Sequence, residues 1–203
     1  MLDRIAVSIL VSPSTSASPR ASSADADLVE AVLRGERVAE EMLYRRHAPA
    51  VLRLATRLLR SQEDALDVLQ DTFVTAFEDL PDLRDRSAFQ PWLHRVTVRL
   101  VHRRFRTKKL LRLLGLDRTD DGVSLETLAE EGASPETRVE LRWLDRALTA
   151  LDDKTRIAWM LRHVEGLSLE ETADSCGCSL ATAKRRIAAG DVVVRTHIDG
   201  GPS

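Results

Sequence analysis

Apolar residues recur along most of the chain at the three- and four-residue spacing of amphipathic helices. From residue 25 they form three successive stripes, and each stripe predicts one buried helix face. The stripes are Leu28, Val32 and Leu33; Val38, Met42 and Leu43; and Val51, Leu52, Ala55, Leu58 and Leu59. We predict that all of them pack into an apolar core.

The next predicted helix spans residues 64–80. Ser61 precedes Asp64 by three residues, which resembles a capping box with Asp in place of Glu, and Pro81 stops the helix. The apolar face of this helix carries Leu66, Leu69, Phe73, Ala76 and Phe77. The opposite face is polar and net acidic, with Asp67, Gln70, Asp71, Thr75 and Glu78. Such a face is either solvated or a docking surface, and the pattern leaves both interpretations open.

A further helix is predicted to begin near Ser87 and to end in a basic run, residues 99–106. Phe89 and Trp92 lie three residues apart among apolar neighbours, so packing in the core is favoured over stacking on nucleic-acid bases.

Two segments lack helical periodicity. Residues 1–24 are rich in Ser, Ala and Pro and predict a disordered tail, although the run 5–11 weakly resembles a signal peptide. Residues 113–136 combine glycines with acids and predict a flexible linker. We therefore predict an all-α protein with two small helical domains, 25–112 and 137–203, on either side of an acidic linker.

The second domain contains a predicted helix-turn-helix between residues 167 and 187. Ser168 and Glu171 form a capping box, Gly177 permits the turn, and Ser179 caps the second helix. The start of such a helix reads base edges in the major groove. The candidate contacts with duplex DNA are Ser179, Thr182, Lys184, Arg185 and Arg186.

Charge is distributed unevenly, although the formal net charge of the 203 residues is only −2. The stretch 82–118 carries eleven Lys or Arg against three Asp, whereas 119–145 carries eight acids against two Arg. A basic block beside an acidic one indicates either a nucleic-acid-binding face that the rest of the protein can mask or a pair of solvated helix faces, and charge alone leaves both interpretations open. No apolar run reaches the ~18 residues of a membrane span, so membrane insertion is not predicted.

The two cysteines, Cys176 and Cys178, do not form a disulfide framework and lack the spacing of a zinc site, so a reducing cytoplasm fits best. We predict that they are small buried apolar side chains. The sequence does not combine its five histidines with a nucleophile, a metal-ligand pattern or a phosphate-binding loop. We therefore predict that the protein is not an enzyme and that it binds no metal, no other cofactor and no small-molecule substrate.

Four segments, 43–49, 63–73, 89–96 and 163–173, together resemble the bacterial sigma factors of the extracytoplasmic-function (ECF) group. The resemblance covers residues 27–190 and implies a subunit that binds core RNA polymerase and promoter DNA, and that an anti-sigma factor can hold inactive. It implies polymerase contacts at Asp67, Gln70 and Asp71. It also implies that the loop 83–88 and the following helix contact the minus-ten element, with Leu83, Arg84, Arg86, Arg95, Arg99 and Arg103 as candidates. The helix-turn-helix would read the minus-thirty-five element.

This sequence departs from the family pattern at several positions. Arg99 stands where the family usually has Asn, and Arg103 where it often has Asp, so the family's minus-ten preference is not transferred. Gly190 and the run 192–194 are predicted to interrupt the last helix. A helix-turn-helix regulator that acts without polymerase is the alternative function, and it would bind duplex DNA as a dimer.

Overall fold

The computed structural model describes residues 19–114 and 135–199, and every regular element among these residues is a helix. This confirms the all-α fold class. The chain divides into two compact units, one spanning Thr15–Thr119 and the other containing Asp120–Ser203. Most of the predicted linker and residues 1–18 lie outside the described residues. In the described part of the chain, no helix is both long and apolar enough to cross a membrane.

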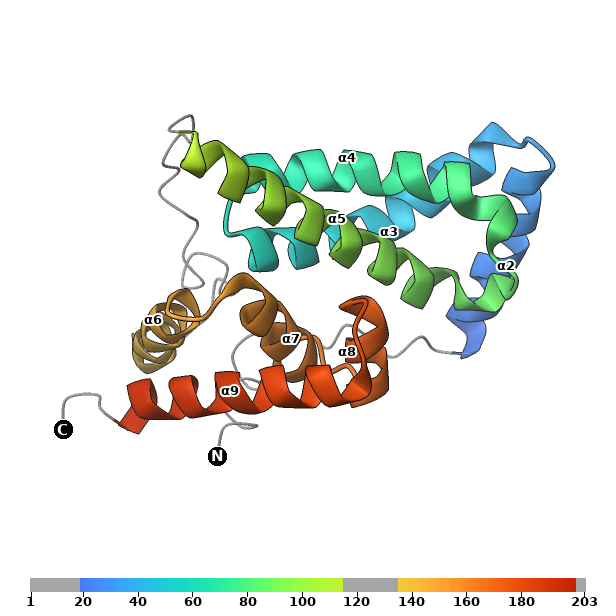
Figure 1. Ribbon diagram of the computed structural model, residues 1–203. Helices are drawn as coiled ribbons and strands as arrows, with labels where there is room; N and C mark the ends of the chain where they lie inside the picture. Colours follow the sequence, from blue (N-terminus) through green and yellow to red (C-terminus); the bar gives the residue numbers. More distant parts are fainter. Residues whose placement is uncertain (1–18, 115–134, 200–203) are drawn as a thin grey trace. The chain divides into compact units, whose positions relative to one another are not determined.

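The N-terminal unit contains four α-helices and two short 3-10 turns (Figure 1). These elements are α2 (Pro19–Leu33), α3 (Arg37–Leu59), α4 (Gln62–Asp79), η1 (Leu80–Asp82), η2 (Arg86–Ala88) and α5 (Phe89–Leu113). Helix α3 packs against α2, α4 and α5, and α5 runs beside α4. Phe89 is fully buried and its ring centroid lies 5.9 Å from that of Trp92, which packs on the same core. Core packing of this aromatic pair is confirmed.

Helix α2 begins earlier than the sequence predicts. The helix starts at Pro19, so residues 19–24 are helical and not part of a tail. Asp25, only 2% exposed, bonds to Arg46 at 2.7 Å and lies 3.1 Å from Nε2 of His47. These contacts attach α2 to α3.

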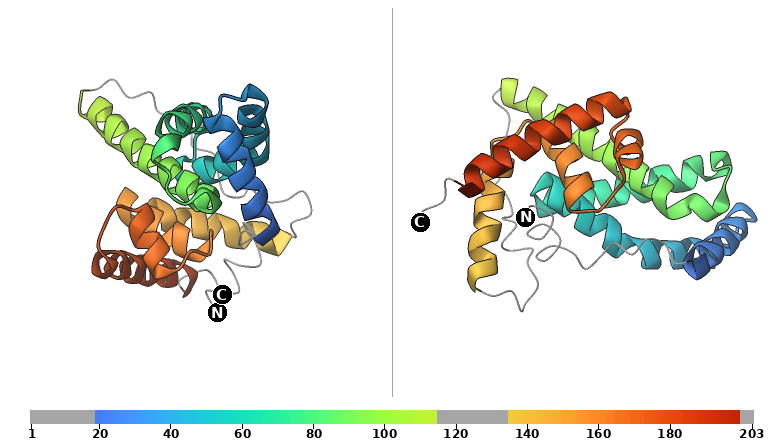
Figure 2. Two further views of the ribbon diagram at one scale, coloured as in Figure 1. Left: turned by 90° about the vertical axis from the view of Figure 1, so that its right-hand side faces the viewer. Right: turned by 90° about the horizontal axis from the view of Figure 1, so that it is seen from below.

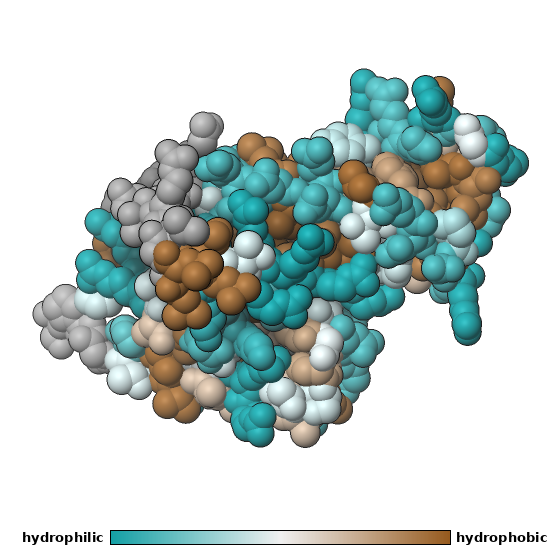
Figure 3. All heavy atoms as spheres, turned by 45° about the horizontal axis from the view of Figure 1, so that its top comes forward, coloured by the Kyte–Doolittle hydropathy of each residue, from teal (hydrophilic) through white to brown (hydrophobic). Residues whose placement is uncertain are grey.

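Four apolar side chains predicted to be buried are exposed. Val38 is 70% exposed, Met42 47%, Leu66 48% and Leu33, at the end of α2, 37%, so the prediction was wrong at these positions. Their spacing fits an amphipathic stripe, but the helices that pack on α2, α3 and α4 cover only part of that stripe. Figure 3 shows apolar patches (brown) breaking the hydrophilic surface (teal) of the molecule.

The C-terminal unit contains α6 (Pro135–Thr149), α7 (Asp153–His163), α8 (Leu169–Ser175) and α9 (Leu180–Asp199). Helix α9 packs against each of the other three helices (Figure 2). The fully buried side chains of this unit include Leu141, Leu148, Ile157, Trp159, Met160 and Leu161.

Helix α9 is continuous through Gly190, so the predicted interruption was wrong. Gly190 is required there by packing: a Cβ at this position would lie 2.6 Å from Cδ1 of Trp159. The indole N–H of Trp159 donates to Oδ1 of Asp191 at 2.9 Å, and His163 lies 3.0 Å from the same oxygen. The glycine therefore lets α9 approach α7 closely.

Candidate nucleic-acid interface

Four arginines of α5 form one exposed cationic stripe. Arg95, Arg99, Arg103 and Arg106 are spaced by four, four and three residues, which places them on one side of the helix, and all four are exposed. Arg99 lies 3.4 Å from Asp79, but both side chains are about half exposed, so this ion pair is weak and the guanidinium stays accessible. A stripe of this kind suits a nucleic-acid backbone.

The loop before α5 is held by its own side chains. Oδ1 of Asp85 accepts hydrogen bonds from the amide of Ser87 at 3.0 Å and from its hydroxyl at 2.6 Å. These bonds hold the pKa of the Asp85 carboxyl below its ordinary value. Arg86 donates to Glu30 of α2 at 3.2 Å. Leu83 is buried in the apolar core and Arg86 is half-buried, so of the three loop residues predicted to contact DNA only Arg84 is exposed.

The helix-turn-helix has the local structure that the sequence predicts. Both hydrogen bonds of the capping box between Ser168 and Glu171 are present at the start of α8. Gly177 has φ +58°, a left-handed conformation that favours glycine, and the hydroxyl of Ser179 accepts from the amide of Thr182 at 3.2 Å. These bonds fix the start of α9 relative to α8.

The five predicted contacts at the start of α9 differ in their surroundings. Lys184 and Arg185 are exposed, whereas Thr182 and Arg186 are half-buried. Burial alone would raise the pKa of the Asp152 carboxyl, but bonds from Thr155 and Lys154 and the nearby charge of Arg186 hold that pKa below its ordinary value. The charge of Arg186 thus lies near the cap of α7, whereas Lys184 and Arg185 are exposed to solvent.

The polar face of α4 lies beside an apolar groove. Asp67, Gln70 and Asp71 are exposed, as the pattern predicts. The groove has a volume of about 520 Å³ and is lined by Tyr44, Leu66, Leu69, Gln70, Phe73, Val74 and Phe77. The ring of Tyr44, from α3, lies 4.7 Å from that of Phe73. An apolar groove with an acidic rim can bind a helix that carries apolar and basic side chains.

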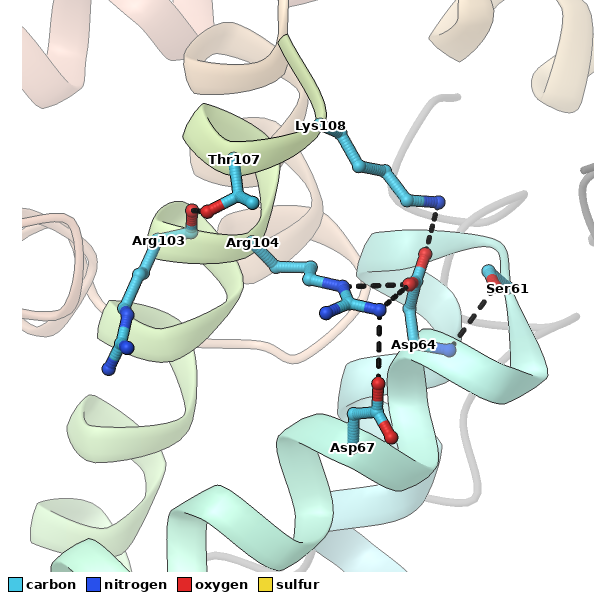
Figure 4. Close-up of polar contacts among 7 residues, drawn as sticks. All are labelled: Ser61, Asp64, Asp67, Arg103, Arg104, Thr107 and Lys108. Atoms are coloured by element: carbon cyan, nitrogen blue, oxygen red, sulfur yellow. Dashed lines mark hydrogen bonds and ion pairs between the residues drawn. The ribbon is translucent and has the colours of Figure 1, made fainter. Parts of the chain in front are cut away.

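A polar cluster joins the start of α4 to the end of α5 (Figure 4). Asp64 does not complete the predicted capping box: its amide donates to Ser61, but its buried carboxylate binds Arg104 and Lys108. Burial alone would raise the pKa of the Asp64 carboxyl, yet the bonds and charges of Lys108 and Arg104 outweigh that effect and lower the pKa. Arg104 also donates to Asp67 at 3.0 Å. Sequence reasoning missed this cluster because no local pattern relates residues forty positions apart.

Cys176 and Cys178 are free and only half-buried, so the prediction of buried side chains was too strong. Among the described residues, no group of His, Cys, Asp or Glu could hold a metal ion. Burial, with a smaller contribution from Cys178, raises the pKa of the Cys176 thiol to about 12.

Because of that raised pKa, we expect Cys176 in the folded protein to resist alkylation at pH 8. An ordinary thiol with a pKa near 8.5 is partly thiolate at this pH, so Cys176 should react about a thousandfold more slowly. Iodoacetamide labelling followed by mass spectrometry, with and without denaturant, measures this rate. Equal labelling of Cys176 in both samples would contradict the expectation.

Comparison with known proteins gives matches in both units. The protein-family model Sigma-70 region 2 matches residues 43–110, and Sigma-70, region 4 matches residues 141–190. The chain is 32% identical over 164 residues to the ECF RNA polymerase sigma factor SigM of Mycobacterium tuberculosis. The aligned residues cover 81% of this chain and 79% of that protein.

A second relative is longer than this chain. The ECF RNA polymerase sigma factor SigE of Mycolicibacterium smegmatis is 34% identical over 156 residues, which cover 77% of this chain but only 60% of that protein. Among solved structures, CnrH in complex with the cytosolic domain of CnrY has a similar fold. The TM-score of the superposition is 0.61 and the sequence identity is 24%. The superposition covers 88% of this chain and 99% of the CnrH structure's chain.

Proposed function

The chain belongs to the ECF group of RNA polymerase sigma factors, which direct promoter-specific transcription initiation, and we propose how its two helical units divide that task. The N-terminal unit docks on core polymerase through α4 and contacts the minus-ten element through α5. The C-terminal unit reads the minus-thirty-five element through α9. Members of this group are initiation factors and not catalysts, and we propose that this chain likewise has no catalytic activity and acts in the cytoplasm.

The observation that carries this proposal is the placement of exposed cations in both units. The stripe of Arg95, Arg99, Arg103 and Arg106 follows one side of α5, and Lys184 and Arg185 follow the capped start of α9. Lys and Arg neutralise phosphates, and an arginine at the start of a recognition helix can bond to guanine. Two separate cationic helices suit a protein that contacts two promoter elements.

We place the polymerase contact on α4. Asp67, Gln70 and Asp71 supply polar and acidic groups beside the groove formed by Leu66, Val74 and their neighbours. Interfaces gain most from an apolar anchor in a pocket with complementary charges around it. A polymerase helix with an apolar anchor and basic flanks fits this surface.

We also propose that an anti-sigma factor regulates this chain. The similar structure of CnrH is of a complex with the cytosolic domain of CnrY, and a structure of the sigma factor RpoE from Bartonella quintana is of a complex with the anti-sigma factor NepR.

Transcription by purified core RNA polymerase, with and without this protein, tests the proposal. A pool of genomic fragments from the source organism serves as template. Specific initiation only in the presence of the protein supports the proposal and identifies a promoter. Tight duplex binding by the free protein, without initiation or association with core polymerase, would indicate a conventional regulator.

Lys184→Ala with Arg185→Ala is expected to weaken transcription from that promoter strongly, because each lost base contact costs about 1–3 kcal/mol. The same assay measures the effect. Arg195→Ala is the matched control, since Arg195 is an exposed cation further along the same helix. Unchanged transcription by the double variant would mean that this part of α9 does not lie in the groove of the promoter.

A further inference from the structure

We infer that Arg104 is a positioning residue, which holds the last turns of α5 against α4 and thereby sets the direction in which Arg103 and Arg106 face promoter DNA. This inference rests on the proposed role of the α5 stripe. It assigns opposite roles to two adjacent arginines of the basic run, Arg103 toward DNA and Arg104 toward the protein.

The contacts of Arg104 are those of an anchored side chain. Its Nε donates to Oδ1 of Asp64 at 2.7 Å, and one terminal nitrogen lies 2.6 Å from the same oxygen. That nitrogen also donates to Oδ2 of Asp67 at 3.0 Å. Lys108, one turn further along α5, binds the other oxygen of Asp64. Two cations of α5 are thus fixed on two carboxylates of α4.

Apolar burial is weaker in this part of α5, where Phe105 is half-buried. The buried side chains of the helix extend from Phe89 to Val101, and none of the side chains described between His102 and Leu114 is buried. The Asp64 side chain, in contrast, is only 5% exposed. Ion pairs with a buried partner are screened less by water than exposed pairs. The cluster of Asp64, Asp67, Arg104 and Lys108 is therefore a polar attachment that links the last turns of α5 to α4.

The rotation of α5 about its own axis decides where Arg103 points. Adjacent residues of a helix are turned by about 100° from each other, so an inward Arg104 directs Arg103 outward. Figure 4 shows Arg103 pointing away from α4 and Arg104 pointing toward it. Arg106 is exposed and continues the outward stripe. If the cluster is lost, this part of α5 can turn or separate from α4, and the stripe loses its alignment.

Asp64→Asn separates this inference from a simple charge effect. Asp64 is buried and acidic, so on electrostatic grounds alone its neutralisation should strengthen the binding of anionic DNA. Loss of the positioning contacts should instead weaken binding, by about fivefold or more. We would reconstitute holoenzyme from core RNA polymerase and the full chain, and measure its affinity for the labelled promoter fragment identified by the transcription assay. Asp27→Asn, which removes the same charge from an exposed position of α2, is the matched control.

Two further variants test the connection between the cluster and Arg103. Arg104→Lys keeps the charge but cannot bond to both carboxylates in the same way, so DNA affinity should fall by about twofold to fivefold. In an Arg103→Gln background, Asp64→Asn should have a clearly smaller effect than in the wild-type background, because one of the two DNA contacts that it positions, that of Arg103, is already gone. Circular dichroism and affinity for core polymerase show whether each variant folds and docks.

Affinity of the Asp64→Asn holoenzyme equal to or greater than that of wild type would overturn the inference. So would strictly additive effects of Asp64→Asn and Arg103→Gln. If Asp64→Asn does not fold, wild-type DNA affinity of the Arg104→Lys holoenzyme would overturn the inference instead. Failure of the proposed function has a different signature, since the wild-type holoenzyme itself would then not select a promoter.

Discussion

Asp71→Arg is expected to weaken binding to core RNA polymerase about thirtyfold or more. Asp71 is exposed on the polar face of α4, next to Gln70 of the groove and three residues before Val74, and the proposed partner carries basic side chains there. The reversal would place like charges side by side at the interface, and such a juxtaposition costs several kcal/mol. Adding Asp67→Arg should bring binding below detection. Affinity measured by fluorescence anisotropy with labelled sigma factor gives the size of the loss.

The single variant is the cleaner test of this surface. Asp67 accepts a hydrogen bond from Arg104, so a cation at position 67 would also disturb the attachment of α5. Asp71 is exposed, and Asp27→Arg reverses the same charge on an exposed position of α2 as a control. Undiminished binding by a folded Asp71→Arg variant would remove α4 as the docking surface.

Gly190→Ala is expected to destabilise the C-terminal unit by about 1–2 kcal/mol net, which is the packing cost less the gain in helix propensity. Alanine favours a helix over glycine by about 1 kcal/mol, but forcing a methyl group into a packed core costs more. The new Cβ would lie 2.6 Å from Cδ1 and 3.0 Å from Cγ of Trp159. Trp159 is 1% exposed and its indole bonds to Asp191, so the ring cannot move away without losing that bond.

Hydrogen exchange of the α7 and α9 amides measures this loss in the C-terminal unit alone, which matters because the chain has two units and need not unfold in one step. Ala189→Gly is the matched control, since residue 189 is exposed and only helix propensity should change there. Increased protection in Gly190→Ala would show that helix propensity outweighs the contact with Trp159.

The sequence predicted those parts of the fold that depend on neighbours along the chain. The capping box of Ser168 and Glu171, the turn at Gly177 and the cap at Ser179 are all formed, because each needs only residues three or four positions apart. The same local patterns identified the exposed face of α4 and the buried Phe89.

Exposure of individual apolar residues could not be predicted in the same way. Val38, Met42 and Leu66 have helical spacing, but whether a stripe is covered depends on which helices pack beside it. Leu83 differs from its prediction in the opposite direction. It lies in a loop that was predicted to contact DNA, but its side chain is buried in the core.

By itself, the sequence determined that this protein is helical, where its recognition helix begins, and which family it resembles, because periodicity, caps and motifs are local. Only the tertiary structure decided that Gly190 lies against Trp159 and that Arg104 binds Asp64 while Arg103 faces outward. Arg103 and Arg104 are chemically identical neighbours. What separates them is the rotation of α5, and contacts between residues distant in the chain set that rotation.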